Sequence, residues 1–249
     1  MFGERLDRGI ILACTVFSSV VILGLLPLAI RRYGTTPDNA RYFMGFFHIL
    51  LWVVVGGLAM RKWRQPLIAL MRRYEGRPKS AFIAFSVLLA CIEEALACLM
   101  TNLGRLFGDP TGQVYITASA NYLDLAFLHS VIVIVPQVAI WSWILERYRF
   151  TSSRLFVLFG VQGGLAEIAF AGMQPALFPT WLLVYALMTW LPYQAFEPAL
   201  ERARIRKNPG FLIQILSLVL VQAGCILFSL AFLAISYGLF GHPLSHFPK

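Results

Sequence analysis

Ionisable side chains stand inside long apolar stretches of this sequence, where a carboxylate costs several kcal/mol unless something compensates it. The adjacent Glu93 and Glu94 lie within "VLLACIEEALACLMTN", His129 follows 35 residues after Glu94, and Glu167 comes 38 residues later. Two neighbouring buried carboxylates are tolerated where one holds a proton, or where a histidine or a cation pairs with them. An acid pair with a histidine suits general acid–base catalysis, and it suits proton or cation binding equally well.

The same residue types are also candidate metal ligands. His48, His129, Glu94 and Glu167 combine imidazole with carboxylate groups, a set that suits zinc or non-haem iron. The Glu-x-x-His pairs of carboxylate-bridged di-iron bundles are missing from the sequence. The sequence therefore allows a divalent metal cofactor but does not require one, and its identity stays open.

The elements that must position these groups are apolar blocks long enough to cross a bilayer. The chain is 59% hydrophobic and 13% charged, whereas soluble domains are roughly a quarter charged. We expect an all-α, polytopic transmembrane helix bundle of about seven helices, forming a single integral membrane domain over residues 1–249. The expected spans are 10–30, 42–60, 81–102, 121–145, 155–173, 177–196 and 211–238.

The basic residues predict the orientation of this bundle. The N-terminus and the segments 61–79, 146–154 and 201–210 hold 16 of the 21 Lys and Arg residues. Positive charge gathers in short cytoplasmic loops, so the N-terminus should be cytoplasmic and the C-terminus outside. The net charge of +9 then favours anionic lipid headgroups at the cytoplasmic face as partners, not nucleic acid. The expected location is the cytoplasmic membrane of a bacterium or archaeon.

The ionisable groups fall at one depth in such a bundle. At about 1.5 Å of rise per residue, Glu93, Glu94 and Glu167 lie roughly 18–20 Å from the cytoplasmic side. His129, on a helix running the other way, comes out at about 18 Å, and His48 slightly higher. We therefore expect Glu93 or Glu94, His129 and Glu167 to meet in one cavity.

Helix faces support this expectation. A stripe of mostly small residues on segment 155–173 carries Glu167 in its middle, and small residues let a neighbouring helix approach closely. The stripe consists of Gly160, Gly164, Glu167, Ala171 and Gln174. On segment 121–145, Tyr122, His129 and Pro136 are seven residues apart and should share a face.

Two connecting segments have recognisable signals of their own. Segment 61–80 contains "RQPLIALMRRYEG", in which apolar residues stand among arginines, as in a short amphipathic helix on a membrane surface. Segment 103–120 has turn residues at Gly108-Asp109-Pro110 and at Gly112.

The order of Glu93-Glu94, then His129, then a further polar residue, each on a later helix, resembles the CAAX prenyl protease and bacteriocin-processing family of membrane glutamate hydrolases. In that family the motifs are Glu-Glu-x-x-x-Arg, Phe-x-x-x-His and a second His with a nearby Asn. This sequence has Cys98 at the Arg position, Leu125 at the Phe position and Glu167 where the second His is expected. The resemblance implies that Glu93 or Glu94 activates water, His129 assists, and a third group stabilises the oxyanion.

The residues and the resemblance together favour a membrane-embedded hydrolase of a lipid-like or membrane-peptide substrate. The candidate catalytic residues are Glu93, Glu94, His129 and Glu167. A proton- or cation-coupled transporter or channel remains an alternative, as does a structural subunit of a membrane complex or oligomer. In the last case protonated glutamates would hydrogen-bond the helices together.

Overall fold

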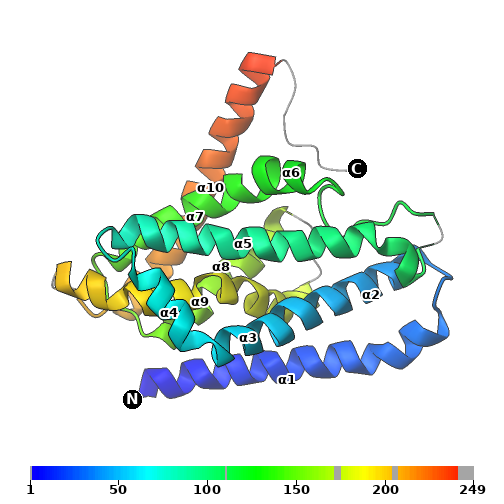
Figure 1. Ribbon diagram of the computed structural model, residues 1–249, viewed down its shortest axis with the longest axis horizontal. Helices are drawn as coiled ribbons and strands as arrows, with labels where there is room; N and C mark the ends of the chain where they lie inside the picture. Colours follow the sequence, from blue (N-terminus) through cyan, green and yellow to red (C-terminus); the bar gives the residue numbers. More distant parts are fainter. Residues whose placement is uncertain (1, 110, 171–174, 204–206, 241–249) are drawn as a thin grey trace.

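The computed structural model is all-helical and describes residues 2–109, 111–170, 175–203 and 207–240 (Figure 1). The α-helices are α1 (Phe2–Arg31), α2 (Pro37–Ile49), α3 (Gly57–Lys62), α4 (Arg64–Arg72), α5 (Pro78–Asn102), α6 (Tyr122–Leu125), α7 (Val131–Leu145), α8 (Ser152–Phe170), α9 (Phe178–Ala203) and α10 (Phe211–Phe240). Two π-helical segments, η1 (Leu50–Gly56) and η3 (Ala126–Ser130), and two 3-10 turns, η2 (Gly104–Phe107) and η4 (Pro175–Leu177), complete the described elements.

Within the described residues, five helical stretches are long and apolar enough to cross a membrane: Arg5–Arg31, Pro37–Lys62, Pro78–Asn102, Pro175–Arg202 and Phe211–Leu239. A sixth is formed if the bent pair Tyr122–Leu128 and Ile132–Leu145 counts as one span. By length and composition, the chain is an integral membrane protein. Five of the seven expected segments agree with these stretches, and a sixth, 121–145, agrees if the bent pair is one span. The remaining segment, 155–173, falls on α8 and ends outside the described residues, so a total of seven stays a prediction.

The helix expected over 121–145 is divided in the structure into α6, η3 and α7, with a bend of 40°. Sharp bends occur at prolines and π-helical turns, and Pro136 leaves the carbonyl of Ile132 without its helical donor. A π-helical turn also holds more residues than an α-helical turn. The expected common face of Tyr122, His129 and Pro136 stays a prediction, because the side chain of His129 lies outside the described part of the chain.

The closest helix packing joins α8 to α9 and depends on glycine. A Cβ at Gly163 would lie 2.0 Å from Cγ of Tyr185, and one at Gly160 would lie 2.4 Å from the carbonyl oxygen of Leu182. Gly164 meets the Phe178 ring at 2.8 Å in the same way. No larger side chain fits these positions without movement. The small-residue contact expected at Gly160 and Gly164 is thus confirmed, while Ala171 and Gln174 lie outside the described residues.

The basic segments gather at one end of the bundle, which we call the basic end and define by residues 61–79, 146–154, 201–203 and 207–210, together with Asp7 of α1. Ion pairs join these segments to one another: Lys79–Glu146 at 3.2 Å, Arg149–Glu201 at 2.8 Å and Arg202–Glu75 at 2.7 Å. A fourth pair, Arg154–Asp7 at 2.7 Å, ties the start of α8 to α1, and Asp7 is only 2% exposed. The N-terminus, α4 and the start of α5 lie together on the left of Figure 1.

Helix α4 confirms the expected helix in segment 61–80, but its surroundings differ from the expectation. Ile68 and Met71 are buried within the core that α9 shares, and Arg64 donates from Nε to Oε1 of Gln194 at 2.5 Å. This part of the apolar face is therefore covered by protein, whereas Leu70 remains exposed.

The opposite end carries the turn expected in segment 103–120. Gly108 and Gly112 have φ values of 81° and 70°, a region that glycine adopts most readily. Burial raises the pKa of Asp109, but N–H groups of Val114 and Thr111 and the Thr111 hydroxyl donate to its carboxylate. The hydrogen bonds outweigh burial, so the pKa of Asp109 lies below its ordinary value. The turn is thus stabilised by a charged acceptor.

Candidate functional site: a carboxylate cluster between helices

The first contact of the candidate site joins α2 to α5. Nε2 of His48 lies 3.0 Å from Oε1 of Glu93, and the two side chains are 3% and 6% exposed. The approach is off the line of a hydrogen bond, so Nε2 has no aligned partner among the described side chains. His48 occupies the last turn of α2, directly before the π-helical segment η1. A buried imidazole beside a carboxylate can exchange a proton with it.

Glu94 points to a different neighbour, because adjacent residues on a helix are about 100° apart. Its Oε1 accepts a hydrogen bond of 2.5 Å from the Ser130 hydroxyl, at the junction between η3 and α7. Ser130 is buried, whereas Glu94 is half-buried. His129 precedes Ser130 in the π-helical segment, but its side chain lies outside the described part of the chain. The predicted approach of His129 to the glutamates therefore stays a prediction.

Glu167 on α8 is held by a tyrosine from α9. The Tyr185 hydroxyl donates to Oε1 of Glu167 at 2.5 Å. Gly163 lies one turn before Glu167 and packs directly on the Tyr185 ring, so the glycine contact decides where this hydroxyl sits. A phenol buried in an apolar helix generally finds a hydrogen-bond partner, and here the partner is a carboxylate.

These three contacts belong to one site, which we call the carboxylate cluster: His48, Glu93, Glu94, Ser130, Glu167 and Tyr185. Glu93 and Glu167 are close enough to interact electrostatically with Glu94, and Glu167 interacts with His48 in the same way. Tyr185 lies within electrostatic range of all three glutamates. Among the described ion pairs, none joins a cluster carboxylate to Lys or Arg. Three carboxylates thus share one histidine and two hydroxyl groups.

Sequence reasoning had identified the three glutamates and treated His48 as a metal ligand. It had missed Ser130 and Tyr185. The signal for Tyr185 was present, because a hydroxyl within "WLLVYALM" requires a partner and Gly163 leaves room for its ring. Ser130 had no comparable signal, since serine in a membrane helix commonly bonds to its own backbone.

A metal site is not formed by the described side chains. No group of three or more His, Cys, Asp and Glu in the described part of the chain could hold a metal ion. His48, Glu94 and Glu167 therefore form no ligand group by themselves, and the set that includes His129 stays a prediction because that side chain lies outside the described part of the chain. The cluster, by contrast, is suited to proton transfer.

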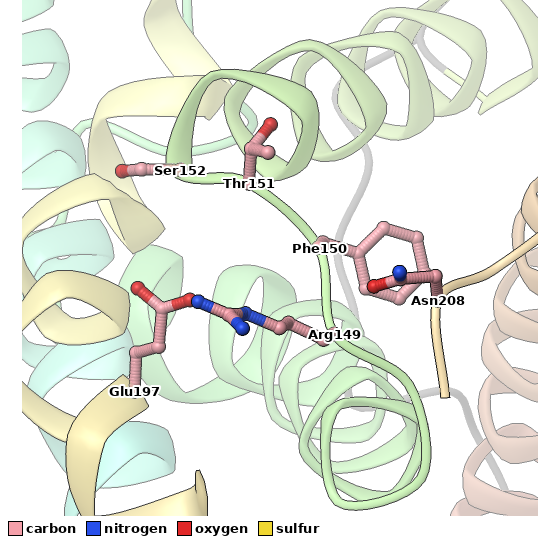
Figure 2. A pocket seen from close by; sticks show the side chains of 6 residues that line it. All are labelled: Arg149, Phe150, Thr151, Ser152, Glu197 and Asn208. Carbon is pink, nitrogen blue, oxygen red and sulfur yellow. The ribbon is translucent and has the colours of Figure 1, made fainter. Parts of the chain in front are cut away.

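A hollow of about 400 Å³ lies at the basic end, away from the cluster (Figure 2). It is lined by Arg149, Phe150, Thr151, Ser152, Glu197 and Asn208. Figure 2 shows Arg149 and Glu197 pointing toward one another across it. The Tyr193 hydroxyl donates to the Phe150 carbonyl and lies 3.2 Å from Oε1 of Glu197, so the hollow borders on a buried tyrosine of α9.

Comparison of the chain with models of protein families, with curated proteins and with solved structures found no match.

Proposed function

We propose that this protein is a membrane-embedded hydrolase in which the glutamate pair activates water against a lipid-like or membrane-peptide substrate. The observation that supports it most is the buried contact of 3.0 Å between His48 and Glu93, beside a second glutamate. In this proposal a glutamate takes the proton of the attacking water and the histidine returns a proton to the leaving group. His48 takes the assisting role in addition to, or in place of, His129.

Tyr185, held by Glu167, supplies the oxyanion stabilisation in the proposed mechanism. The Tyr185 hydroxyl is a donor beside the glutamates and can turn to an oxyanion that forms near them. Ser130 orients Glu94, because its hydroxyl occupies one carboxylate oxygen. The glutamates then have different neighbours, which allows one to be charged while the other carries a proton.

The orientation is part of the proposal. The basic end faces the cytoplasm, and an odd number of crossings places the C-terminus outside. Single cysteines at Leu70 and Gln113, in protein whose own cysteines are replaced, test it with a membrane-impermeant thiol reagent. We expect Leu70→Cys to be labelled only from the cytoplasmic side and Gln113→Cys only from the other. Labelling of both from the same side would contradict the orientation.

Hydrolysis is tested with purified protein in lipid nanodiscs, using fluorogenic ester lipids and a quenched transmembrane peptide. Glu93→Gln and Glu94→Gln keep the shape of each side chain and remove its titration. Loss of the proton-transfer group should lower turnover by about 10²–10⁴-fold. Glu146→Gln is the matched control, because Glu146 is paired with Lys79 at the basic end. Turnover unchanged in both cluster variants would refute the proposal.

A proton- or cation-coupled transporter is the second candidate, and the absence of Lys or Arg partners for the described cluster carboxylates favours it. Such groups commonly bind a proton or cation in transporters. In that case Glu94→Gln abolishes pH-dependent flux into liposomes, and wild-type protein shows no hydrolysis to lose. If the substitution alters only thermal stability, the glutamates serve to hold the helices together.

A further inference from the structure

Four fully buried side chains in the core between the cluster and the basic end have polar atoms without a partner. They are Ser86 Oγ, Gln137 Nε2, Trp141 Nε1 and Thr189 Oγ1, and each residue is at most 2% exposed. Buried polar atoms are nearly always hydrogen-bonded, to protein or to an ordered water molecule. Their side chains come from α5, α7 and α9, and α5 packs against both of the others.

Their positions along the helices follow one direction. Ser86 precedes Glu93 by seven residues on α5, and Gln137 follows Ser130 by seven residues on α7. Both spacings return to the same helix face about 10 Å nearer the basic end. On α9, Thr189 lies one turn beyond Tyr185 in that direction. Each helix therefore carries an unpartnered polar group on the cluster's own face.

The series continues to the hollow. Trp141 lies one turn beyond Gln137, and its ring packs edge-on against Phe150 at 5.8 Å between centroids. Phe150 lines the hollow, and its carbonyl accepts from Tyr193, which lies one turn beyond Thr189 on α9. The α7 and α9 series thus converge on Phe150, beside Glu197.

We propose that these side chains bind a chain of water molecules that connects the hollow at the basic end to the carboxylate cluster. Ordered water in a protein takes two to four polar partners, and the four unpartnered groups supply them at successive helix turns. Gaps of about 6–10 Å between these turns need one to three water molecules at ordinary hydrogen-bond spacing. This chain of water molecules carries water and protons between the hollow and the glutamates, whichever reaction the glutamates serve.

Water-edited solid-state NMR of the whole protein in lipid bilayers tests this proposal without a variant or a substrate. Polarisation that starts on water should reach the side chains of Ser86, Gln137 and Thr189 as fast as it reaches exposed Thr111. Ala186, buried on the same helix as Thr189, should show no polarisation from water at that time. Build-up at Ser86, Gln137 and Thr189 no faster than at Ala186 would overturn the proposal.

Substitution then tests whether the bound water forms one chain. In the double variant Ser86→Ala/Thr189→Val, the water signal at the Gln137 amide should fall to the level of Ala186. Ser142→Ala is the control, because the buried Ser142 hydroxyl already donates to the Ala139 carbonyl of its own helix. An unchanged Gln137 signal in the double variant would refute a connected chain. Because none of these measurements requires turnover, they can fail or succeed independently of the proposed hydrolysis.

Discussion

Carboxylates at the basic end and carboxylates in the cluster are compensated in opposite ways. At the basic end, Asp7 lies 2.7 Å from Arg154, and Glu75 lies 2.7 Å from Arg202. In the cluster, Glu93 meets a histidine, while the described side-chain donors to Glu94 and Glu167 are hydroxyl groups. Permanent cations hold a carboxylate in its charged form, whereas histidine and hydroxyl groups allow it to gain and lose a proton.

The two regions are also held together differently. Ion pairs between helix ends and the adjoining loops join the basic end, and direct helix contact at glycine joins α8 to α9 beside the cluster. Exposed ion pairs contribute little to stability, while close packing is intolerant of added volume. The difference indicates that the basic end fixes the register of the helix ends and that packing fixes the geometry of the reactive groups.

The largest expected effect is that of Gly163→Ala. Its Cβ would lie 2.0 Å from the Tyr185 ring, so α8 and α9 must separate or the tyrosine must leave Glu167. We expect a loss of about 3 kcal/mol in the free energy of unfolding. Thermal unfolding in detergent measures it. Gly24→Ala is the control, because a Cβ at Gly24 of α1 meets nothing within 4 Å. Equal melting temperatures would show that the α8–α9 contact is not tight.

A smaller loss is expected when the buried ion pair of the basic end is broken. Arg154→Ala leaves Asp7, 2% exposed, without the guanidinium beside it, and should cost about 2 kcal/mol. In Arg202→Ala the lost pair is exposed on both sides, and the cost should stay below about 1 kcal/mol. Urea or thermal unfolding of the two variants compares them. A larger loss of unfolding free energy in Arg202→Ala than in Arg154→Ala would contradict the prediction that the buried pair stabilises the fold more than the exposed pair.

Removing a charged carboxylate from the cluster should affect stability in the opposite way to removing one from the basic end. Glu93→Gln removes a carboxylate that has no Lys or Arg partner among the described ion pairs, so we expect stability to change by less than about 1 kcal/mol or to rise. Asp7→Asn, which takes the carboxylate from Arg154, should instead lower the melting temperature. Destabilisation by Glu93→Gln equal to that by Asp7→Asn would mean that the cluster glutamate is structural as well.

The smallest expected effect concerns Asp109, outside both regions. Because its pKa is lowered in the folded protein, its charge stabilises the fold at pH above the ordinary Asp value of 3.8. That contribution disappears as the pH falls through the lowered pKa. Asp109→Asn should therefore lower the melting temperature by about 1 °C at neutral pH and by less in acid. A difference between the two proteins that grows in acid would contradict the assigned hydrogen bonds.

The sequence by itself determined the class of protein and the chemistry available to it. Apolar blocks of about 20 residues require helices in a bilayer, because every backbone polar group must be paired within its own segment. The glycine spacing on segment 155–173 predicted a close helix contact, and Gly108 with Gly112 predicted a turn. The basic segments predicted one charged end, and the ion pairs join them there. All of these are local patterns, which determine a helix, a turn or a charged segment without reference to the rest of the chain.

Only the tertiary structure decided which partner each glutamate meets. His48 and His129 fall at similar depths by residue count, and depth alone does not distinguish them. The pairing of Glu93 with His48 depends on α2 packing beside α5. The π-helical turn and 40° bend changed the face of the segment that holds Ser130, and α9 brought Tyr185 to Glu167 across the glycine contact. Contacts of this kind join residues far apart in the chain, and they follow from helix rotation and tilt, which residue spacing within one helix does not specify.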